Sequence, residues 1–270
     1  EHLFCEADCV IHCAAKTGDW GRYREFFQIN VLGTRNVIRA CKKNNIRKLI
    51  FLSTPSVYYN GQDRYSILED KPLPKKQFSY GKTKLICEKD LLSLADDGFQ
   101  TIIFRPRAVY GRYDRTIVPR ILKMAEQKSI PLINGGNALV DLTYIGNFMQ
   151  AVQRALSAPD NAWNEIYNIS NGDPITIRFW FSQVLDIFDR PFNPKDIPFS
   201  LAYSLALVKE ATSRLPFGNT RPSLTRFSVG YMGKSMTMSI EKARQLLGYQ
   251  PEYSNQEGFQ NYQIWYEGQT

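Results

Sequence analysis

Tyr80 and Lys84 are the residues whose types and spacing could do chemistry. In a helix, side chains four positions apart project from the same face, so this spacing puts an ammonium beside a phenol. A free tyrosine has a pKa of about 10, and a neighbouring positive charge stabilises the phenolate and lowers that pKa. Such a pair is suited to general acid–base catalysis, in which a side chain exchanges a proton with the reacting group.

The segment before this pair strengthens an otherwise weak signal, because the same spacing occurs by chance in many chains. Residues 47–53 contain two basic residues and then a short apolar run, which is followed by the hydroxyl residues Ser53, Thr54 and Ser56. The run predicts a buried parallel strand, and ligands bind at the carboxyl ends of such strands in open α/β sheets. The sequence therefore predicts a strand, a hydroxyl cluster and a Tyr/Lys helix acting together.

Segments 53–58 and 80–84 resemble the extended short-chain dehydrogenase/reductase superfamily, which includes the NAD-dependent epimerase/dehydratase and 3β-hydroxysteroid dehydrogenase groups. Segments 30–34, 105–111 and 141–147 match it as well, so that the resemblance runs from about Asp8 to the C-terminus. It implies an α/β fold with a Rossmann-type doubly wound parallel sheet and a smaller C-terminal substrate-binding region. The expected division is an NAD(P)-binding core over residues 1–170 and a mostly helical cap over residues 171–270.

Residues 9–15 resemble the fourth strand of the family's sheet, and Ala14 and Ala15 resemble the small-residue turn that lies along the cofactor. A glycine fingerprint that wraps the pyrophosphate is expected upstream, and the 270 residues contain none. We therefore expect the N-terminal strands to be missing, roughly sixty residues if two βα units of about thirty each are absent. NAD and NADP both stay open, because the residue that distinguishes them follows the second strand.

The resemblance assigns catalytic roles to Tyr80, Lys84, Thr54 and Asn30. Tyr80 would exchange a proton with the substrate oxygen, while Lys84 would lower the pKa of Tyr80 and hydrogen-bond the nicotinamide ribose. Thr54 would hold the substrate oxygen, and Asn30 would hold a backbone bend or a water molecule. Asparagine and glycine are both poor residues inside a helix, so Asn30 and Gly33 also indicate a special site within the helix predicted over residues 23–45.

Further site residues are expected on the cofactor side and on the substrate side. Ala14, Ala15, Ser53 and Pro106 would line the cofactor together with Tyr80 and Lys84, although Pro106 could simply end its strand. The residues expected to face the substrate are Thr54, Ser56 and Tyr144.

The substrate class follows from departures within the same motifs. Family dehydratases carry Asp-Glu after the hydroxyl residue, where this chain has Pro55-Ser56. Nucleotide-sugar epimerases usually have arginine and aspartate where this chain has Val140 and Asn147, so the chain resembles the 3β-hydroxysteroid dehydrogenase and 2-alkyl-3-oxoalkanoate reductase branch. An apolar helix predicted over residues 197–215 would be a buried cap or a wall of the substrate site that touches a membrane.

These observations predict an NAD(P)-dependent oxidoreductase that acts on a hydrophobic secondary alcohol or ketone. The substrate would be 3β-hydroxysteroid-like or a long-chain β-hydroxy or β-keto compound. Two alternatives stay open, a nucleotide-sugar epimerase and a non-catalytic dinucleotide-binding regulatory protein. Persistent inactivity of a protein that binds its cofactor would favour the latter.

The composition restricts partners and location. The net charge of +8 is dispersed and no nucleic-acid-binding motif accompanies it, so no nucleic acid is expected as a partner. The cysteines number five, and an odd count favours reduced thiols and a cytoplasmic protein. No stretch approaches the ~20 apolar residues of a membrane span. A small-molecule substrate and a homodimer formed through the Tyr/Lys helix are expected.

A metal site near the N-terminus is not expected. Cys5, Cys9, Cys13 and His12 are potential ligands. Residues 10–13 are predicted to form a strand, however, and neighbouring side chains of a strand point to opposite faces. His12 and Cys13 could not then bind the same ion.

Overall fold

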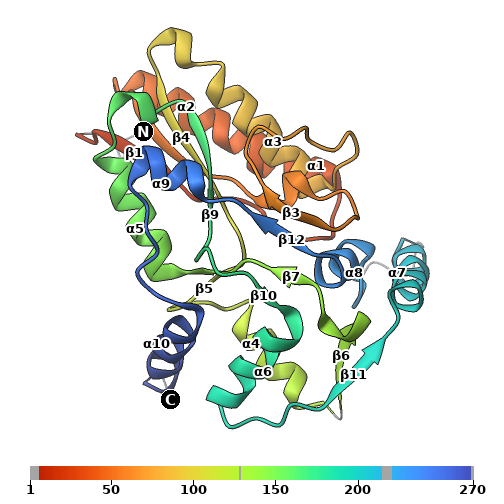
Figure 1. Cartoon of the computed structure of the whole chain (residues 1–270). Coiled ribbons are helices and arrows are strands. Elements are labelled where there is room, and N and C mark those ends of the chain that lie inside the picture. Colours follow the sequence, from red (N-terminus) through yellow and green to blue (C-terminus); the bar gives the residue numbers. More distant parts are fainter. Residues whose placement is uncertain (1–5, 128, 215–220, 269–270) are drawn as a thin grey trace.

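A four-stranded parallel sheet forms the centre of the computed structural model, which describes residues 6–127, 129–214 and 221–268 (Figure 1). The strand order is β1-β2-β4-β9, with β1 spanning Cys9–His12, β2 Lys48–Leu52, β4 Gln100–Pro106 and β9 Glu165–Ile169. Each strand pairs in parallel with its neighbour, so all four carboxyl ends meet at one edge.

Helices cover both faces of this sheet, which confirms the predicted doubly wound α/β fold. The side chains of Leu49 and Phe51 pack in a cluster with α2 (Gly33–Lys43) and α3 (Ser79–Leu92). Ile50 points the other way and packs with α5 (Ile145–Leu156) and α9 (Glu241–Leu247). Both faces of a central parallel strand are buried in this arrangement, which explains the continuous apolar run of β2.

The helix predicted over residues 23–45 is interrupted at the position that Asn30 and Gly33 indicated. The chain forms α1 (Tyr23–Phe26), a π-helical turn η2 (Phe27–Leu32) and then α2. Single π-turns inside helices occur frequently at functional sites. Asn30 lies within η2 and is fully buried.

A second group of elements lies beyond the carboxyl edge of the sheet (Figure 1). One mixed sheet has the order β10-β7-β12-β3, and two smaller parallel pairs are β11-β6 and β5-β8. The strands span Arg64–Ile67 (β3), Val109–Tyr110 (β5), Ile130–Ile133 (β6), Leu139–Val140 (β7), Thr143–Tyr144 (β8), Ile175–Thr176 (β10), Pro194–Ile197 (β11) and Met236–Met238 (β12). The helices span Val118–Ala125 (α4), Ile177–Ile187 (α6), Phe199–Ser213 (α7), Arg226–Gly233 (α8) and Asn255–Glu267 (α10). Short 3₁₀ turns occupy Pro55–Tyr58 (η3), Ala95–Asp97 (η4), Asn134–Gly136 (η5) and Asp160–Ala162 (η6).

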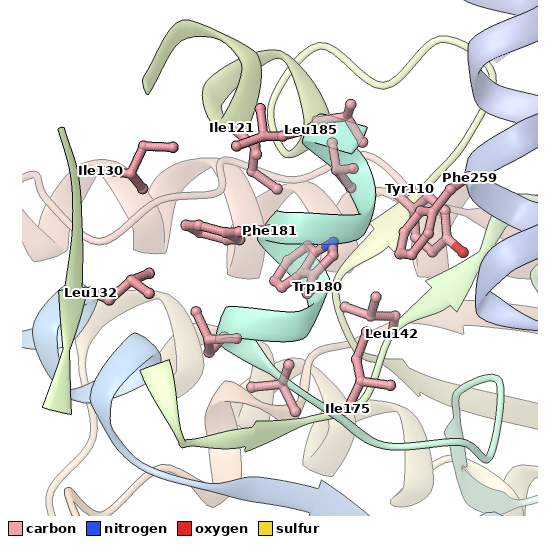
Figure 2. Close-up of a cluster of buried hydrophobic side chains, with 14 of the residues drawn as sticks. Tyr110, Ile121, Ile130, Leu132, Leu142, Ile175, Trp180, Phe181, Leu185 and Phe259 are labelled. Atoms are coloured by element: carbon pink, nitrogen blue, oxygen red, sulfur yellow. The ribbon is translucent and has the colours of Figure 1, made fainter. Parts of the chain in front are cut away.

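This second group has its own hydrophobic core (Figure 2). Trp180 and Phe181 of α6 pack there against Ile121 of α4, Ile130 of β6 and Phe259 of α10. The core thus takes residues from both sides of position 170, and α9 returns to the first sheet. The division into residues 1–170 and 171–270 stays a prediction.

Two predicted helices have different limits in the structure. The apolar periodicity of residues 116–128 predicts a helix, and the structure forms α4 there, which begins at Val118 because the Asp114 carboxylate accepts hydrogen bonds from the Ile117 and Val118 N–H groups. Lys128, its predicted end, lies outside the described residues. The helix predicted over residues 197–215 is α7, which begins after Pro198; Leu215 also lies outside the described residues.

Helix α7 buries its small side chains rather than its large apolar ones. Ala202, Ala206 and Glu210 are buried, whereas Leu205 and Val208 are 46% and 60% exposed. The prediction of a buried apolar cap helix is therefore wrong for the leucine-bearing face, because the face packed towards α8 is the alanine face. Over the described ranges, no helix has the length and apolarity needed to cross a membrane.

The described cysteines Cys9, Cys13, Cys41 and Cys87 are free thiols. Cys5 lies outside the described residues. Within those ranges, no cluster of three or more potential metal ligands occurs.

Candidate active site

Tyr80 and Lys84 lie in the first two turns of α3, beside the carboxyl edge of the parallel sheet. The Tyr80 side chain is half-buried, and the Thr54 hydroxyl acts on its phenol by lowering the Tyr80 pKa. Lys84 is 1% exposed, and its Nζ lies 3.8 Å from the centre of the Phe51 ring. The structure thus brings together three of the four predicted catalytic residues.

Burial dominates the ionisation of both side chains. It raises the pKa of Tyr80 to about 12, against the smaller lowering effect of the Thr54 hydrogen bond. It also lowers the pKa of Lys84 to about 8, because a buried ammonium loses its hydration. In the protein chain by itself, the Tyr80 pKa is therefore raised, whereas the sequence predicted that it would be lowered. At neutral pH, the Tyr80 phenol is protonated and ready to donate.

The hydroxyl cluster after β2 is held by its own hydrogen bonds. Thr54 caps the turn η3 by accepting a hydrogen bond from the Ser56 N–H at 3.2 Å, and its Oγ1 lies 3.0 Å from Ser56 Oγ. Both side chains are buried. The turn therefore fixes Thr54 beside Tyr80 and places Ser56 next to it.

Gly81 lets α3 approach this turn closely. A Cβ at residue 81 would lie 3.0 Å from the carbonyl oxygen and 3.2 Å from the carbonyl carbon of Ser56. Because the contact is with backbone, no side chain can move aside to make room.

We expect Gly81→Ala to push α3 away from the turn and to lower kcat/KM by about tenfold or more, since misplacement by about 1 Å can cost about 10²-fold. Steady-state kinetics and a thermal melt would measure this. Gly33→Ala is the matched control, since a Cβ there meets nothing within 4 Å and the backbone is helical. If Gly81→Ala and the wild type had equal activities, the close approach of α3 to the Ser56 backbone would not set the geometry of the site.

Asn30 connects the loop after β1 to α3. Its Oδ1 accepts from the Lys16 N–H at 2.7 Å, and its Nδ2 donates to the Lys16 carbonyl and to Thr83 Oγ1, each at 3.0 Å. Thr83 in turn donates to the Tyr80 carbonyl at 2.9 Å. The geometry agrees with a residue that holds a backbone bend near Tyr80, and its catalytic role stays a prediction.

Ser53 belongs to a buried polar network. Its hydroxyl donates to Glu88, which also receives a hydrogen bond from Arg105 Nε at 2.9 Å. Both charged side chains of this ion pair are at most 2% exposed. Ser53 therefore helps to anchor β2 to α3, and its predicted contact with a cofactor stays a prediction.

The other predicted residues lie at different distances from this centre. Pro106 is the last residue of β4 and pairs with Ile169, while Ala14 and Ala15 follow β1 and are exposed and half-buried. Tyr144 lies in another cluster, with its ring 5.7 Å from that of Tyr110 and 5.2 Å from that of Tyr253. The cofactor and substrate roles of these residues stay predictions.

A pocket of about 530 Å³ opens at Tyr80. Its lining is mostly polar and charged, with Trp20, Phe26 and Phe78 supplying an aromatic part that can contact an apolar portion of a ligand. It also contains four arginines that the sequence analysis missed, which are Arg22, Arg214, Arg221 and Arg226.

Ion pairs connect distant parts of the chain around this pocket. Arg221 pairs with Asp19 at 2.7 Å, and Arg226 pairs with the buried Glu210 at 2.9 Å. Arg22 and Arg214 form no ion pair with a described residue. The pocket lining therefore combines these arginines with acidic residues, and no local sequence signal could have found these pairings.

Lys84 provides a test of whether the site fits a nicotinamide dinucleotide. Its ammonium is buried on the face of Phe51 and forms no ion pair with any residue that the structure describes. Ribose hydroxyls could accept the hydrogen bonds that this buried donor lacks. Tyr80, Lys84 and the small residues after β1 thus fit the group that the motifs imply.

Comparison with known proteins gives consistent similarities. Residues 2–170 match the NAD dependent epimerase/dehydratase family. A 2-alkyl-3-oxoalkanoate reductase of Stenotrophomonas maltophilia (strain K279a) is 35% identical over 268 residues, which cover 95% of this chain and 80% of that protein. The decarboxylating sterol-4-alpha-carboxylate 3-dehydrogenase of Schizosaccharomyces pombe is 29% identical over 263 residues, with coverages of 95% and 76%.

A solved structure shares the fold over nearly the whole chain. UDP-glucuronic acid 4-epimerase from Bacillus cereus, in complex with NAD, superposes with a TM-score of 0.74 at 25% identity, covering 99% of this chain and 77% of that one.

Proposed function

Because the chain belongs to the NAD dependent epimerase/dehydratase family, we propose that it interconverts a secondary alcohol and a ketone on a largely apolar β-hydroxy or β-oxo acid. The protein is an NAD(P)-dependent oxidoreductase, as its named reductase and dehydrogenase relatives indicate. The observation that carries the proposal is the Tyr80 phenol, which lines the pocket one turn from the buried Lys84 and whose pKa the Thr54 hydroxyl lowers. The non-catalytic interpretation is not supported, because the acid–base pair is intact.

Tyr80 handles the proton in this mechanism. In reduction, the Tyr80 hydroxyl donates its proton to the substrate oxygen as hydride adds to the carbonyl carbon. In oxidation, the Tyr80 phenolate accepts the proton of the substrate hydroxyl. Thr54 holds the substrate oxygen beside Tyr80, and the positive charge of Lys84 stabilises the phenolate form.

The cofactor is NAD or NADP. Its nicotinamide ring, when bound, supplies or takes up the hydride. Lys84 would hold its ribose, and Ala14, Ala15 and Pro106 would border it. A bound cofactor with a positively charged ring would also favour the phenolate of Tyr80.

The substrate class rests on what two relatives have in common. A 3-oxoalkanoate and a sterol-4-carboxylate oxidised at C3 both have a carboxylate carbon two bonds from the reacting carbon. The aromatic lining of the pocket supports an apolar remainder. The test is to incubate the protein with NADH or NADPH and a long-chain 3-oxo acid while following the reduced nicotinamide. Failure to consume either cofactor with any β-oxo compound would refute the proposal.

Epimerisation of a nucleotide sugar is the second candidate. The arginines in the pocket lining favour it, since arginine binds diphosphates well. Interconversion of UDP-sugars without net formation of NADH would support this candidate over the first.

We expect kcat/KM for reduction to fall above about pH 8, because this parameter follows the pKa values of the free enzyme. The Lys84 ammonium has a pKa of about 8, so it is charged below that pH and loses its charge above it. Tyr80, with a pKa of about 12, stays protonated. Lys84→Arg keeps its charge at all these pH values, so its profile should be flat. If the wild type and Lys84→Arg had identical pH profiles, the fall in kcat/KM could not be due to loss of the Lys84 charge.

Association with other molecules is proposed at two surfaces. We propose a homodimer through α3 and the neighbouring η2 and α2 segment, where Ile29 and Leu32 are exposed, and sedimentation velocity would test it.

Peripheral membrane contact would use the exposed leucines of α7, and vesicle co-sedimentation would test that. A cytoplasmic location stays a prediction from the free thiols, which fractionation would check.

A further inference from the structure

Arg107 is a buried cation, and two of its guanidinium nitrogens have no hydrogen-bond partner among the described residues. Its side chain is 1% exposed, yet neither Nε nor Nη1 has a partner. Arginine is almost always charged and carries five N–H donors, and leaving such donors unsatisfied in the interior is costly. A group that accepts hydrogen bonds is therefore expected beside Arg107.

The neighbours of Arg107 do not fill this role. Its guanidinium carbon lies 3.8 Å from the centre of the Tyr231 ring, a contact that uses the face of the group and leaves the N–H donors free. The positive charge of Arg107 lowers the pKa of the acidic residue Asp141, against the larger raising effect of burial. The carboxylate of Asp141, however, accepts hydrogen bonds from the Met238 N–H at 2.6 Å and from Ser170, and it forms no ion pair with Arg107 among the described residues.

The chain places Arg107 and Thr54 at the same edge of the parallel sheet. Leu52 pairs with Phe104 across β2 and β4, and the Ser53 N–H donates to the Phe104 carbonyl at 2.7 Å. Thr54 and Arg107 each follow the end of one of these two neighbouring strands, and adjacent strands lie about 4.8 Å apart. The Tyr231 ring, which the Arg107 guanidinium contacts, also affects the pKa of Tyr80. Arg107 and the Thr54 turn are therefore held at the edge where ligands bind in open α/β sheets.

We propose that the Arg107 guanidinium binds the carboxylate of a β-hydroxy or β-oxo acid while Tyr80 and Thr54 hold its reacting oxygen. This inference rests on the proposed function and adds the residue that selects acids over esters. A carboxylate two bonds from the reacting carbon would lie close to Tyr80 and Thr54, and Arg107 follows the strand adjacent to that of Thr54. Arginine suits this role because charge-assisted hydrogen bonds to carboxylates are strong.

The test compares 3-hydroxydecanoate with its methyl ester in the wild type, Arg107→Gln, Arg107→Lys and the exposed control Arg112→Gln. Arg107→Gln is expected to lower kcat/KM for the acid by about 10- to 100-fold, the range for a lost hydrogen bond to a charged group, and to change that for the ester by less than about threefold. Arg107→Lys should retain part of the preference, and Arg112→Gln should retain all of it.

Calorimetric binding of the acid and the ester without cofactor separates this inference from the proposed function. Oxidation of neither compound by the wild type would refute the function, whereas Arg107-dependent binding of the acid alone would still support the site. Equal losses for acid and ester in Arg107→Gln would show a structural role and overturn the inference. Unchanged binding of the acid by that variant would mean that Arg107 holds only water, which also overturns it.

Discussion

Tyr80→Phe is expected to lower the rate of hydride transfer by about 10²- to 10⁴-fold, the usual contribution of a positioned general acid or base. Phenylalanine keeps the ring and its packing but removes the hydroxyl that exchanges the proton and whose pKa Thr54 lowers. The loss should appear mainly in kcat, because the proton is exchanged in the transition state. Single-turnover measurement of nicotinamide oxidation would quantify it.

Tyr113→Phe is the matched control, since Tyr113 is 63% exposed and lies far from α3 in the chain. Its activity should equal that of the wild type. A Tyr80→Phe protein with the wild-type rate would rule out Tyr80 as the proton donor and return the role to a hydroxyl of the Thr54 turn.

Glu88→Gln is expected to lower the free energy of unfolding by about 3–5 kcal/mol, because removing one partner of a buried ion pair leaves an uncompensated buried charge. Glu88 and Arg105 are almost completely buried, and Glu88 also accepts from Ser53. The variant would therefore leave Arg105 charged in the interior and loosen the link between β2 and α3. Urea denaturation would measure the change.

Asp90→Asn provides the comparison from the same helix. Asp90 pairs with Arg35 at 2.7 Å, but both side chains are partly exposed, and such surface pairs contribute at most about 1 kcal/mol. If both variants unfolded at the same urea concentration, the network around Glu88 would not have the stabilising role that its burial implies.

The parts of the fold that could be predicted are those with a local signal. The continuous apolar run of β2 predicted a buried parallel strand, and the four-residue spacing placed Tyr80 and Lys84 on one face of α3. Asn30 and Gly33 indicated an irregularity where the structure has a π-turn. In each case, the information lies within a few residues.

The remainder depends on contacts between distant residues. The sequence could not show that Arg221 pairs with Asp19 across 202 positions, or that Arg107 is buried. It could not show which face of α7 is covered, because both its alanine face and its leucine face have helical spacing. The direction of the Tyr80 pKa failed for a related reason, since burial is a property of the assembled fold and outweighs the charge spacing.

The close approach of Gly81 to the Ser56 carbonyl means that the geometry of the chemical step and the choice of substrate depend on different parts of the chain. The spacing between the proton donor and the hydroxyl turn is set by two backbones that touch directly, and no side chain lies between them. The pocket walls, by contrast, come largely from side chains of the loop at residues 18–22 and of α7 and α8. Substitutions in those walls can therefore change which molecule is accepted while the chemical step keeps its geometry, so that substrate range and reaction type can diverge independently.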